Sequence, residues 1–485
     1  MTRTTLSRSR TTWSLISIFL LSGTLLFFAL QRDGRLLQSH EDPVPGDASA
    51  GPSHEELRTA FFQPSQPTPF PIPEGLKPQV EFWKKIFTEY SSRQAVIHDR
   101  RHVNIIYGVI DLSDRELYSS RARSKSIRSA VHKYKVMLRR LSALDPKKID
   151  SLSGEEQKVF RMVREAPGNY RFDRAQRNFR VQYGLRDKFR RSLTDSTPYL
   201  RDMERIFEGH GLPVELTRLP FAESSFNLEA YSLAGAAGIW QFTRTTGKNY
   251  LKINQYVDER RDPMKSTEAA AQLLSSCYRQ FRSWPLAVTA YNHGSYALQQ
   301  AVRQTNSKDL GTIINQHRGR TFGFSSRNFY AEFLAILEIL QDYQRYFGDI
   351  DILPPDEYEV FFVEHYIKMN TLLANTSLDR DSVSRLNPEL RDAVLTSRRF
   401  LPKHYPLRVP AGMKEELIHA YAMIDPSEKR SHISVTLHHR VKPGQSLSSI
   451  AVLYDTSVRA IMSANSIKNP DRLNVGQLLK IPTRA

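Results

Sequence analysis

Cysteine is nearly absent from this sequence, since Cys277 is the only one among 485 residues. A single thiol excludes a disulfide scaffold and a cysteine-ligated zinc cluster. His293 has no histidine, cysteine or aspartate at metal-ligand spacing, so we expect neither a metal nor a cofactor. Apolar residues still make up 40% of the chain and aromatic residues 10%. This composition predicts real hydrophobic cores, and it excludes a wholly disordered, collagen-like or polytopic membrane protein.

Acidic residues are also in short supply. The chain has 69 Lys+Arg against 51 Asp+Glu, which gives a net charge of +18. Residues 101–200 hold 23 basic and 11 acidic residues, so +12 of the surplus lies there. Such an excess favours a polyanionic neighbour, such as nucleic acid, an anionic lipid headgroup or an acidic cell-wall polymer. Two interpretations are open for this stretch: a solvated helical surface, or an electrostatic contact with lipid or cell wall.

The first 40 residues contain a long apolar stretch. Three arginines among the first ten residues precede an apolar run from Trp13 to Leu30. Eighteen helical residues span about 27 Å, close to the thickness of a bilayer core. We therefore expect residues 1–40 to be an N-terminal membrane anchor, with its basic end in the cytoplasm and the rest of the chain exported. A signal sequence that is cleaved on export is the alternative. Export makes a nucleic-acid partner improbable, and we expect none.

The rest of the chain divides into segments of different composition. Residues 41–78 contain nine prolines and predict an extended linker, because such a stretch cannot hold a helix. Residues 79–199 are the basic region, with apolar side chains at helical spacing. Residues 200–345 carry less charge and show strong helical periodicity. We expect a mainly α chain.

The C-terminal segment, residues 433–485, predicts a small βααβ module. Residues 433–437 alternate like a strand, Ser446 is placed to cap one short helix, and Thr456 or Ser457 to cap a second. A closing strand then runs from residue 478 to 481. A weak repeat of this pattern precedes it at residues 357–411, where Leu407-Arg408-Val409-Pro410 parallels Leu479-Lys480-Ile481-Pro482.

The motifs of this module closely resemble a LysM domain. They are His439–Leu447, Asn465, Asn469-Pro470, Leu473, Val475–Gln477 and Ile481-Pro482. The resemblance implies binding to N-acetylglucosamine-containing glycans of the kind found in peptidoglycan and chitin. Gln445 departs from the family, which usually has aspartate after the turn glycine. The copy at 357–411 lacks the opening turn, so it is interpreted as a degenerate LysM-like region whose glycan binding is doubtful.

The candidate acid lies in the stretch from Gly211 to Phe226. Pro213 suits the first turn of a helix, and Glu223 follows near the helix end, flanked by Phe221 and Phe226. A carboxyl beside apolar side chains loses solvation of its charged form, so its pKa rises toward the value that a general acid needs near neutral pH. Considered alone, a glutamate at a helix end is usually a solvated surface residue.

Three further motifs follow Glu223 in the chain. They are Ser232–Phe242, Asp262-Pro263 with Ser266–Ala270, and Ala290–Gly294. Their order and spacing resemble the catalytic domain of the soluble-type lytic transglycosylases, a branch of the lysozyme-like fold. The combination with LysM looks most like the membrane-bound lytic transglycosylase D group. The resemblance implies a lysozyme-like α-helical catalytic domain over residues 200–345 and peptidoglycan glycan strands as substrate, on the periplasmic side of the bacterial cell envelope.

The resemblance also implies the chemistry. Glu223 is expected to protonate the glycosidic oxygen between N-acetylmuramic acid and N-acetylglucosamine, and then to deprotonate the muramoyl 6-hydroxyl, leaving a 1,6-anhydro end. One carboxylate suffices because the substrate N-acetyl group can stabilise the oxocarbenium charge, unlike in the paired-carboxylate hydrolases. The Glu223 motif shows no second acid suited to that role. A hydrolytic muramidase and a non-catalytic peptidoglycan-binding scaffold are the alternatives.

Six residues are expected to bind substrate by the same resemblance. They are Ser224, Ser232, Gln241, Tyr291, Asn292 and Tyr330. Asn292 is placed to orient the substrate N-acetyl group. Phe329 occupies a position where the family often has a cleft-lining tyrosine, so either Tyr330 takes over or that hydrogen bond is absent. Gly235 and Gly238 permit a close backbone approach, either to a sugar or within packed helices.

Overall fold

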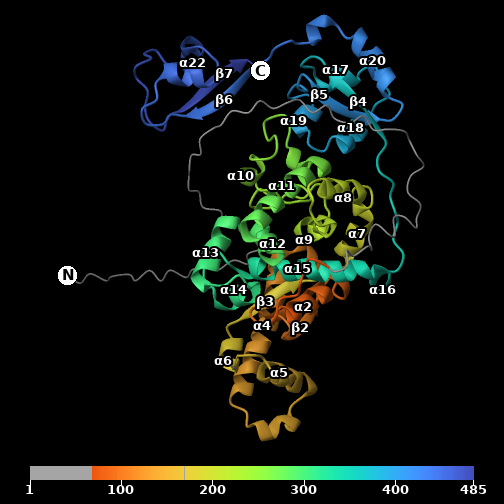
Figure 1. Ribbon diagram of the computed structural model, residues 1–485, viewed down its shortest axis with the longest axis vertical. Helices are drawn as coiled ribbons and strands as arrows, with labels where there is room; N and C mark the ends of the chain where they lie inside the picture. The colour runs from red at the N-terminus through yellow and green to blue at the C-terminus, as the bar shows by residue number, and fades with distance from the viewer. Residues whose placement is uncertain (1–67, 169, 485) are drawn as a thin grey trace, which may run out of the picture. The chain divides into compact units, whose positions relative to one another are not determined.

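The computed structural model describes residues 68–168 and 170–484, and the chain divides into two compact units. Unit 1 comprises the chain up to Leu251 together with Arg260–Pro355, and unit 2 comprises Lys252–Glu259 and Asp356–Ala485. Helices predominate and the sheets are small (Figure 1), which confirms the prediction of a mainly α chain. Among the described residues, no helix has the length and apolar character needed to cross a membrane. The predicted anchor, residues 1–40, lies outside those residues.

The basic region of unit 1 combines helices with a small sheet that the sequence analysis did not predict. The sheet has the order β2-β1-β3, and both pairs are antiparallel. Along β3, Phe179, Val181 and Tyr183 share one face and Arg180 and Gln182 the other, because successive strand side chains point to opposite faces. The elements are α2 (Lys77–Thr88), β1 (Gln94–Asp99), β2 (Ile106–Asp111), α3 (Asp114–Tyr118), α4 (Ser120–Ser142), η1 (Pro146–Ser151), α5 (Gly154–Arg164), α6 (Phe172–Ala175), β3 (Phe179–Tyr183) and α7 (Arg186–Ser196).

The end of the predicted linker packs into unit 1. Phe70 is only 2% exposed, and its ring centroid lies 5.1 Å from that of Phe333 and 5.7 Å from that of Trp284. Helix α2 then begins at Lys77, with proline in its first turn. Its buried apolar face matches the helical spacing seen in the sequence: Val80, Phe82, Trp83, Ile86 and Phe87. Phe70, within the predicted linker, is therefore part of the core of unit 1.

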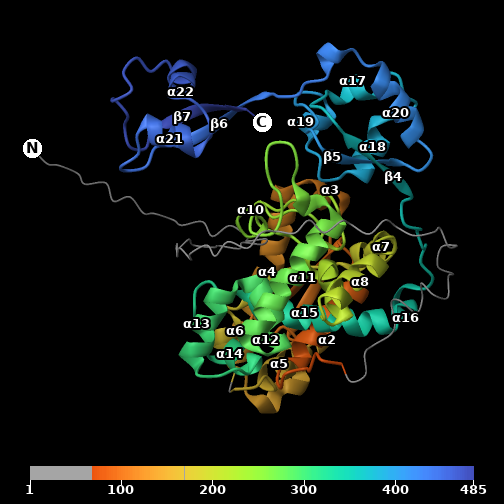
Figure 2. The same ribbon diagram turned by 45° about the horizontal axis from the view of Figure 1, so that its top comes forward.

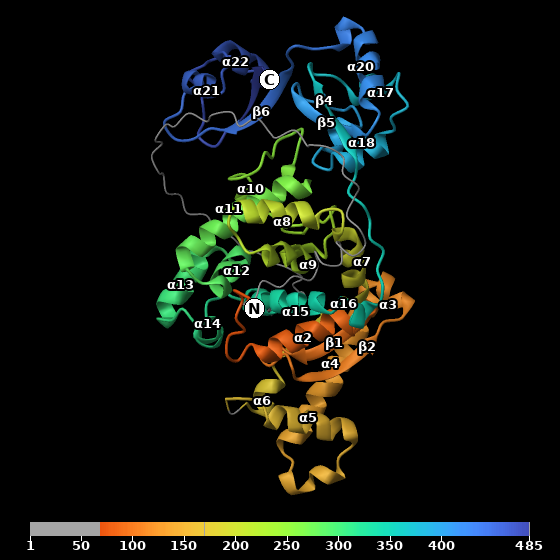
Figure 3. The ribbon, with the colours of Figure 1, turned by 45° about the vertical axis from the view of Figure 1, so that its right-hand side comes forward.

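The remainder of unit 1 is helical and is organised around α15 (Phe324–Gln341). Helix α15 packs against α2 on one side and against α9 and α12 on the other (Figures 1 and 3). The other elements are α8 (Leu200–Gly209), η2 (Val214–Arg218), α9 (Leu219–Ser224), α10 (Arg244–Gly247), η3 (Glu259–Arg261), α11 (Pro263–Phe281), α12 (Trp284–His293), α13 (Ser295–Thr305), α14 (Leu310–Gln316) and α16 (Tyr343–Phe347). Asp262 caps α11, since its side chain accepts from the Lys265 amide at 2.9 Å.

Unit 2 contains two strand–helix–strand modules. The first pairs β4 with β5 and the second pairs β6 with β7, both antiparallel; Figure 2 shows α21 and α22 beside the second pair. The elements are β4 (Tyr358–Val363), α17 (Met369–Leu373), α18 (Arg380–Leu386), α19 (Asp392–Leu395), β5 (Tyr405–Pro410), α20 (Lys414–Met423), η4 (Pro426–Glu428), β6 (Ser434–Arg440), α21 (Leu447–Leu453), α22 (Val458–Asn465) and β7 (Leu478–Arg484).

An asparagine clamp is repeated in the two modules. Asn465 donates to the carbonyl of Lys480 at 2.6 Å and accepts from the Lys480 amide at 2.6 Å. Asn387 makes the same pair of bonds with the main chain of Arg408, at 2.7 and 2.9 Å. Each asparagine also donates to the carbonyl four residues before it. The sequence repeat thus corresponds to a repeated tie between the second helix and the closing strand.

The segment Lys252–Glu259 belongs to unit 2 although both of its flanks belong to unit 1. Tyr256 and Val257 lie in the hydrophobic core formed by the first module. Val257 forms a bridge with Leu390, and the buried carboxylate of Asp258 pairs with Arg391 at 3.1 Å. The segment is therefore an integral part of the first module's fold.

Candidate active site

Glu223 lies in the last turn of a short helix that the sequence placed correctly. The predicted single helix is in fact two pieces, the 3-10 helix η2 followed by α9. Ser225 ends α9 in the left-handed conformation, with φ 51°, and Phe226 follows with φ 55°. This sharp turn buries Phe226 completely behind the carboxyl-bearing turn, as the apolar pattern predicted.

The environment of Glu223 favours the protonated acid. Burial raises the pKa of its carboxyl to about 8, and a hydrogen bond from Asn292 opposes the rise. Burial disfavours the charged form because the interior solvates it poorly. Asn292 lies near the C-terminal end of α12 and is itself buried. The structure therefore brings together two of the predicted residues, with one hydrogen-bond donor aimed at the acid.

The loop after α9 is held by its own side chains. Ser224 donates to the carbonyl of Ile239 at 3.0 Å, and Ser232 accepts from the Ala236 amide at 3.0 Å. Gln241, with φ 48°, donates to the carbonyl of Gly238 at 2.8 Å. These three residues were expected to bind substrate, but the contacts seen here tie the loop together.

Tyr291 connects α12 to that loop. Its hydroxyl donates to the carbonyl of Trp240 at 2.7 Å, and burial and the nearby Glu223 raise its pKa well above the usual value. Trp240 is fully buried, stacks on Phe207 and donates to the Thr267 hydroxyl at 2.8 Å. Tyr291 is thus a neighbour of Glu223, and Trp240 is a core residue.

The expectation for Tyr330 needs correction. Tyr330 is 1% exposed, and its hydroxyl donates to the carbonyl of Pro71 at 2.9 Å. Its hydrogen-bonding group is therefore used to fasten the N-terminal segment of unit 1. Phe329, one residue earlier, is buried and has no polar group to offer. The structure does not bring a tyrosine from this helix to Glu223.

The sequence analysis missed Glu332, which lies near Glu223, and Arg180, which lies near Glu332. Burial raises the pKa of Glu332 on α15 to about 8, the charge of Glu223 adds to the rise, and Arg180 on β3 opposes it. Arg180 comes from the basic region, and burial lowers its pKa to about 10. No local motif marks either residue, because Glu332 meets Glu223 and Arg180 only through the packing of distant elements.

The raised pKa values of Glu223 and Glu332 predict a pH-dependent stability. The folded protein keeps these protons up to about pH 8, whereas an unfolded glutamate releases its proton near its ordinary pKa of 4.5. Stability therefore falls as pH rises through this window. We expect Glu223→Gln to raise the melting temperature relative to wild type more at pH 8 than at pH 5. Thermal unfolding at both values checks this; an equal shift at both would contradict it, and the exposed Glu229→Gln is the matched control.

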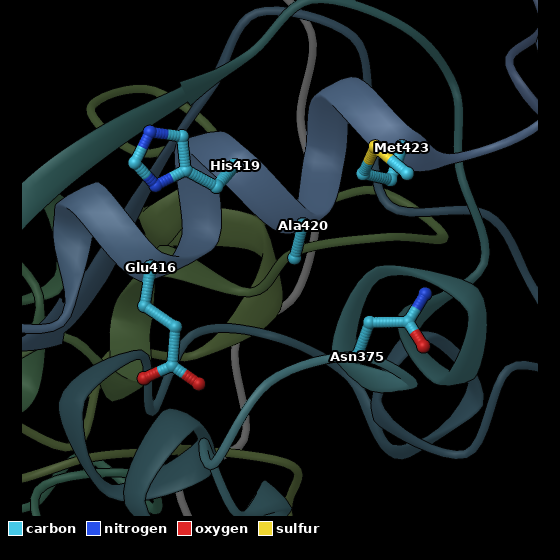
Figure 4. Close-up of a pocket in the computed structure, with 5 residues that line it drawn as sticks. All are labelled: Asn375, Glu416, His419, Ala420 and Met423. Atoms are coloured by element: carbon cyan, nitrogen blue, oxygen red, sulfur yellow. The ribbon is translucent and has the colours of Figure 1, made fainter.

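A separate pocket lies in unit 2. Its volume is about 460 Å³, and Asn375, Glu416, His419, Ala420 and Met423 line it (Figure 4). The carboxylate of Glu416 accepts a hydrogen bond from the Ser377 hydroxyl at 2.8 Å, and Met423 is largely exposed.

Comparisons with known proteins locate two domains around these features. Residues 208–314 match the family model "Transglycosylase SLT domain", and residues 439–482 match the model "LysM domain". The chain contains an SLT domain and a LysM domain. The SLT domain includes Glu223, Gln241, Tyr291 and Asn292, and it ends before Glu332. These matches confirm the predicted resemblance to a lytic transglycosylase catalytic domain and to LysM.

Several known proteins are similar to this chain. Membrane-bound lytic murein transglycosylase D of Escherichia coli K12 is 28% identical over 302 residues, which cover 59% of this chain and 63% of that protein. The chain thus matches less than two thirds of that relative's length. A putative tributyltin chloride resistance protein of Alteromonas sp. is 34% identical over 126 residues, covering 26% of this chain and 61% of that protein.

Solved structures also match. The soluble lytic transglycosylase SLT70 of Escherichia coli is 22% identical, with a TM-score of 0.26, over 31% of this chain and 25% of SLT70. Lytic transglycosylase Slt of Pseudomonas aeruginosa is 17% identical, also with a TM-score of 0.26, over 40% of this chain and 29% of that protein.

Proposed function

We propose that the protein is a peptidoglycan lytic transglycosylase that cleaves the bond between N-acetylmuramic acid and N-acetylglucosamine and leaves 1,6-anhydromuramic acid ends. The observation that carries the proposal is Glu223 of the SLT domain, a poorly solvated carboxyl whose pKa of about 8 keeps it protonated at neutral pH. A general acid needs this state before it meets its substrate. The expected catalytic residue is therefore Glu223, with Asn292 as its orienting partner.

The contacts of Glu223 suit a residue that is first acid and then base. The protonated carboxyl donates its proton to the glycosidic oxygen, and the Asn292 side chain then donates to the carboxylate that remains. The bond between C1 and the glycosidic oxygen breaks, and the N-acetylglucosamine part leaves with the donated proton as a free hydroxyl. The carboxylate next removes the proton of the muramoyl 6-hydroxyl, whose oxygen forms the new bond to C1. The muramoyl 6-hydroxyl belongs to the bound substrate and is held beside C1, which favours it over water as the nucleophile.

A hydrolytic muramidase is the second candidate, because Glu332 supplies a second carboxyl near Glu223. In hydrolases a second carboxylate activates water or forms a covalent intermediate. Digestion of purified sacculi with the full chain, followed by mass spectrometry, separates the two functions. Products lighter by one water are expected from the transglycosylase. Fully hydrated reducing ends would overturn the proposal in favour of the hydrolase.

The LysM domain is proposed to hold the enzyme on the cell wall. Tethering to an insoluble polymer raises the local substrate concentration without changing the chemistry. Removal of residues 434–485 keeps Ile433 in the core of the first module. We expect this deletion to weaken binding to sacculi, measured by pelleting, by about tenfold or more. Cleavage of short soluble glycan strands should stay within about twofold of the full chain. Unchanged pelleting would show that the domain does not target the wall.

The first module of unit 2, residues 357–411, is proposed to be a degenerate LysM-like unit. Its support is the asparagine clamp of Asn387 on Arg408, which repeats that of Asn465 on Lys480. The bacterial cell envelope is the proposed location, facing the periplasm. The apolar run of residues 13–30 supports an anchor there, with signal cleavage as the alternative.

A further inference from the structure

Arginines from three parts of unit 1 gather beside the N-terminal end of α15. They are Arg100 and Arg101 after β1, Arg180 on β3, and Arg318 and Arg327 around the α14–α15 connection. The register of the sheet pairs Arg180 with His98, and the Arg100 amide donates to the carbonyl of Asn178 at 2.6 Å. Because alternate residues of a strand share a face, Arg100 and Arg180 lie on the same side of this sheet as His98.

Two phenylalanine rings form the base of this arginine cluster. The guanidinium carbon of Arg180 lies 3.8 Å from the ring centroid of Phe324, and that of Arg327 lies 5.2 Å from the ring centroid of Phe322. Arg100 lowers the pKa of Arg180 after the larger effect of burial. Arg318 and Arg101 act in the same way on Arg327. Arg180 therefore senses the charge of Arg100, and Arg327 senses the charges of Arg318 and Arg101.

The cluster has little negative charge to balance it. Within residues 68–168 and 170–484, no carboxylate forms an ion pair with any of the five guanidinium groups at 4.0 Å or less. The Nε of Arg180 is buried and makes no hydrogen bond. Glu332 is the one acid whose charge acts on Arg180. Arg100, Arg101 and Arg318 are exposed, so an anion from solution can reach them.

The cluster adjoins the catalytic carboxyl through α15. Ser326, two residues after Phe324, donates to the side-chain oxygen of Asn292 at 3.5 Å. Asn292 in turn donates to Glu223. Glu332, whose carboxyl senses the charges of both Glu223 and Arg180, gives a second link between the acid and the cluster.

We propose that this arginine cluster binds carboxylates of the substrate, and that those carboxylates belong to the peptide stems of peptidoglycan. The inference rests on the proposed function. Guanidinium groups form planar, charge-assisted pairs with carboxylates, and neutral N-acetyl sugars offer none. Three of the five arginines are exposed, which suits contact with a peptide stem attached to the sugar. The basic region then serves substrate recognition.

The test compares two substrates and two double variants of the full chain. Arg100→Ala/Arg101→Ala removes two exposed charges of the cluster, and Arg121→Ala/Arg128→Ala removes two exposed charges of α4 as the matched control. The substrates are soluble peptide-bearing glycan strands and the same strands stripped by an amidase, which keep only the lactyl carboxylate. We expect the cluster variant to lose about tenfold in kcat/KM on peptide-bearing strands, mainly through KM. On stripped strands, the kcat/KM of the cluster variant should stay within about twofold of wild type. The kcat/KM of the control variant should stay within about twofold on both substrates.

Each other outcome overturns the inference. Equal losses on both substrates would assign the contact to the lactyl carboxylate, and no loss would remove the site. Lost binding to phosphatidylglycerol vesicles with unchanged cleavage would assign the arginines to a lipid surface. Calorimetric titration of the free tetrapeptide stem into the catalytically silent Glu223→Gln protein tests the cluster separately. If the tetrapeptide binds this protein and binds more weakly when Arg100 and Arg101 are also replaced, the inference is supported. That result would hold even if the cleavage products contradicted the proposed function.

Discussion

Replacing Glu223 by glutamine is expected to reduce glycan cleavage by about a thousandfold or more, with the fold and wall binding intact. A positioned general acid contributes about 10²–10⁴-fold, and here one carboxyl serves as acid and then as base. Glutamine keeps the shape and can still accept the hydrogen bond of Asn292, but it has no proton to give. The rate of 1,6-anhydro end formation from sacculi measures the loss.

The control for this variant is Glu229→Gln, which makes the same change at an exposed position six residues away. Its activity should stay within about twofold of wild type. Substantial activity in Glu223→Gln would move the acid elsewhere, and Glu332 would be the first residue to test because it has the same raised pKa of about 8.

Replacing Gly238 by alanine is expected to destabilise unit 1 by roughly 3 kcal/mol or more and to abolish activity. Gly238 has φ 75°, and a methyl group there would overlap the carbonyl oxygen of Arg260. The neighbours cannot yield easily, because the Arg260 side chain is buried and donates to the carbonyls of Gly235 and Phe242 at 2.6 and 3.0 Å. The close approach made possible by this glycine is to main chain. Denaturant unfolding followed by circular dichroism measures the effect.

Gly235→Ala is the matched control, since Gly235 has a similar φ of 78° but only the Tyr231 hydroxyl within 4 Å, at 3.8 Å. We expect it to cost about 1 kcal/mol, the strain of a left-handed backbone alone. Equal costs at the two positions would show that the contact with Arg260 relaxes and that backbone strain alone matters.

Local sequence signals predicted the parts of the fold that depend on neighbouring residues. Ser446 and Ser457 cap their helices because a serine hydroxyl accepts the amide three residues on. Asp262 does the same for α11. The apolar residues on either side of Glu223 predicted a poorly solvated carboxyl with a raised pKa. Phe221 and Phe226 are both buried. Such signals lie within a few residues of the feature that they specify.

The missed features depend on contacts between distant segments. Arg180 stands on a strand whose partner, β1, lies more than 80 residues earlier, and helical spacing was a poor guide to a five-residue strand. Glu332 has no motif of its own, and the direction of α15 decides which elements it meets. The hydroxyl of Tyr330 is bonded to Pro71, 259 residues away in the sequence. Propensity and motif spacing carry no information on such pairs.

The segment Lys252–Glu259 also fixes an order of assembly. Asp258 and its ion-pair partner Arg391 are 133 residues apart in the sequence, so during synthesis the segment leaves the ribosome long before its partner exists. Tyr256 and Val257 belong to the core that the later residues complete. A chain that stops at residue 355 therefore exposes two apolar side chains where a core should form, which invites aggregation. The first module of unit 2 therefore completes the burial of a segment that is made earlier.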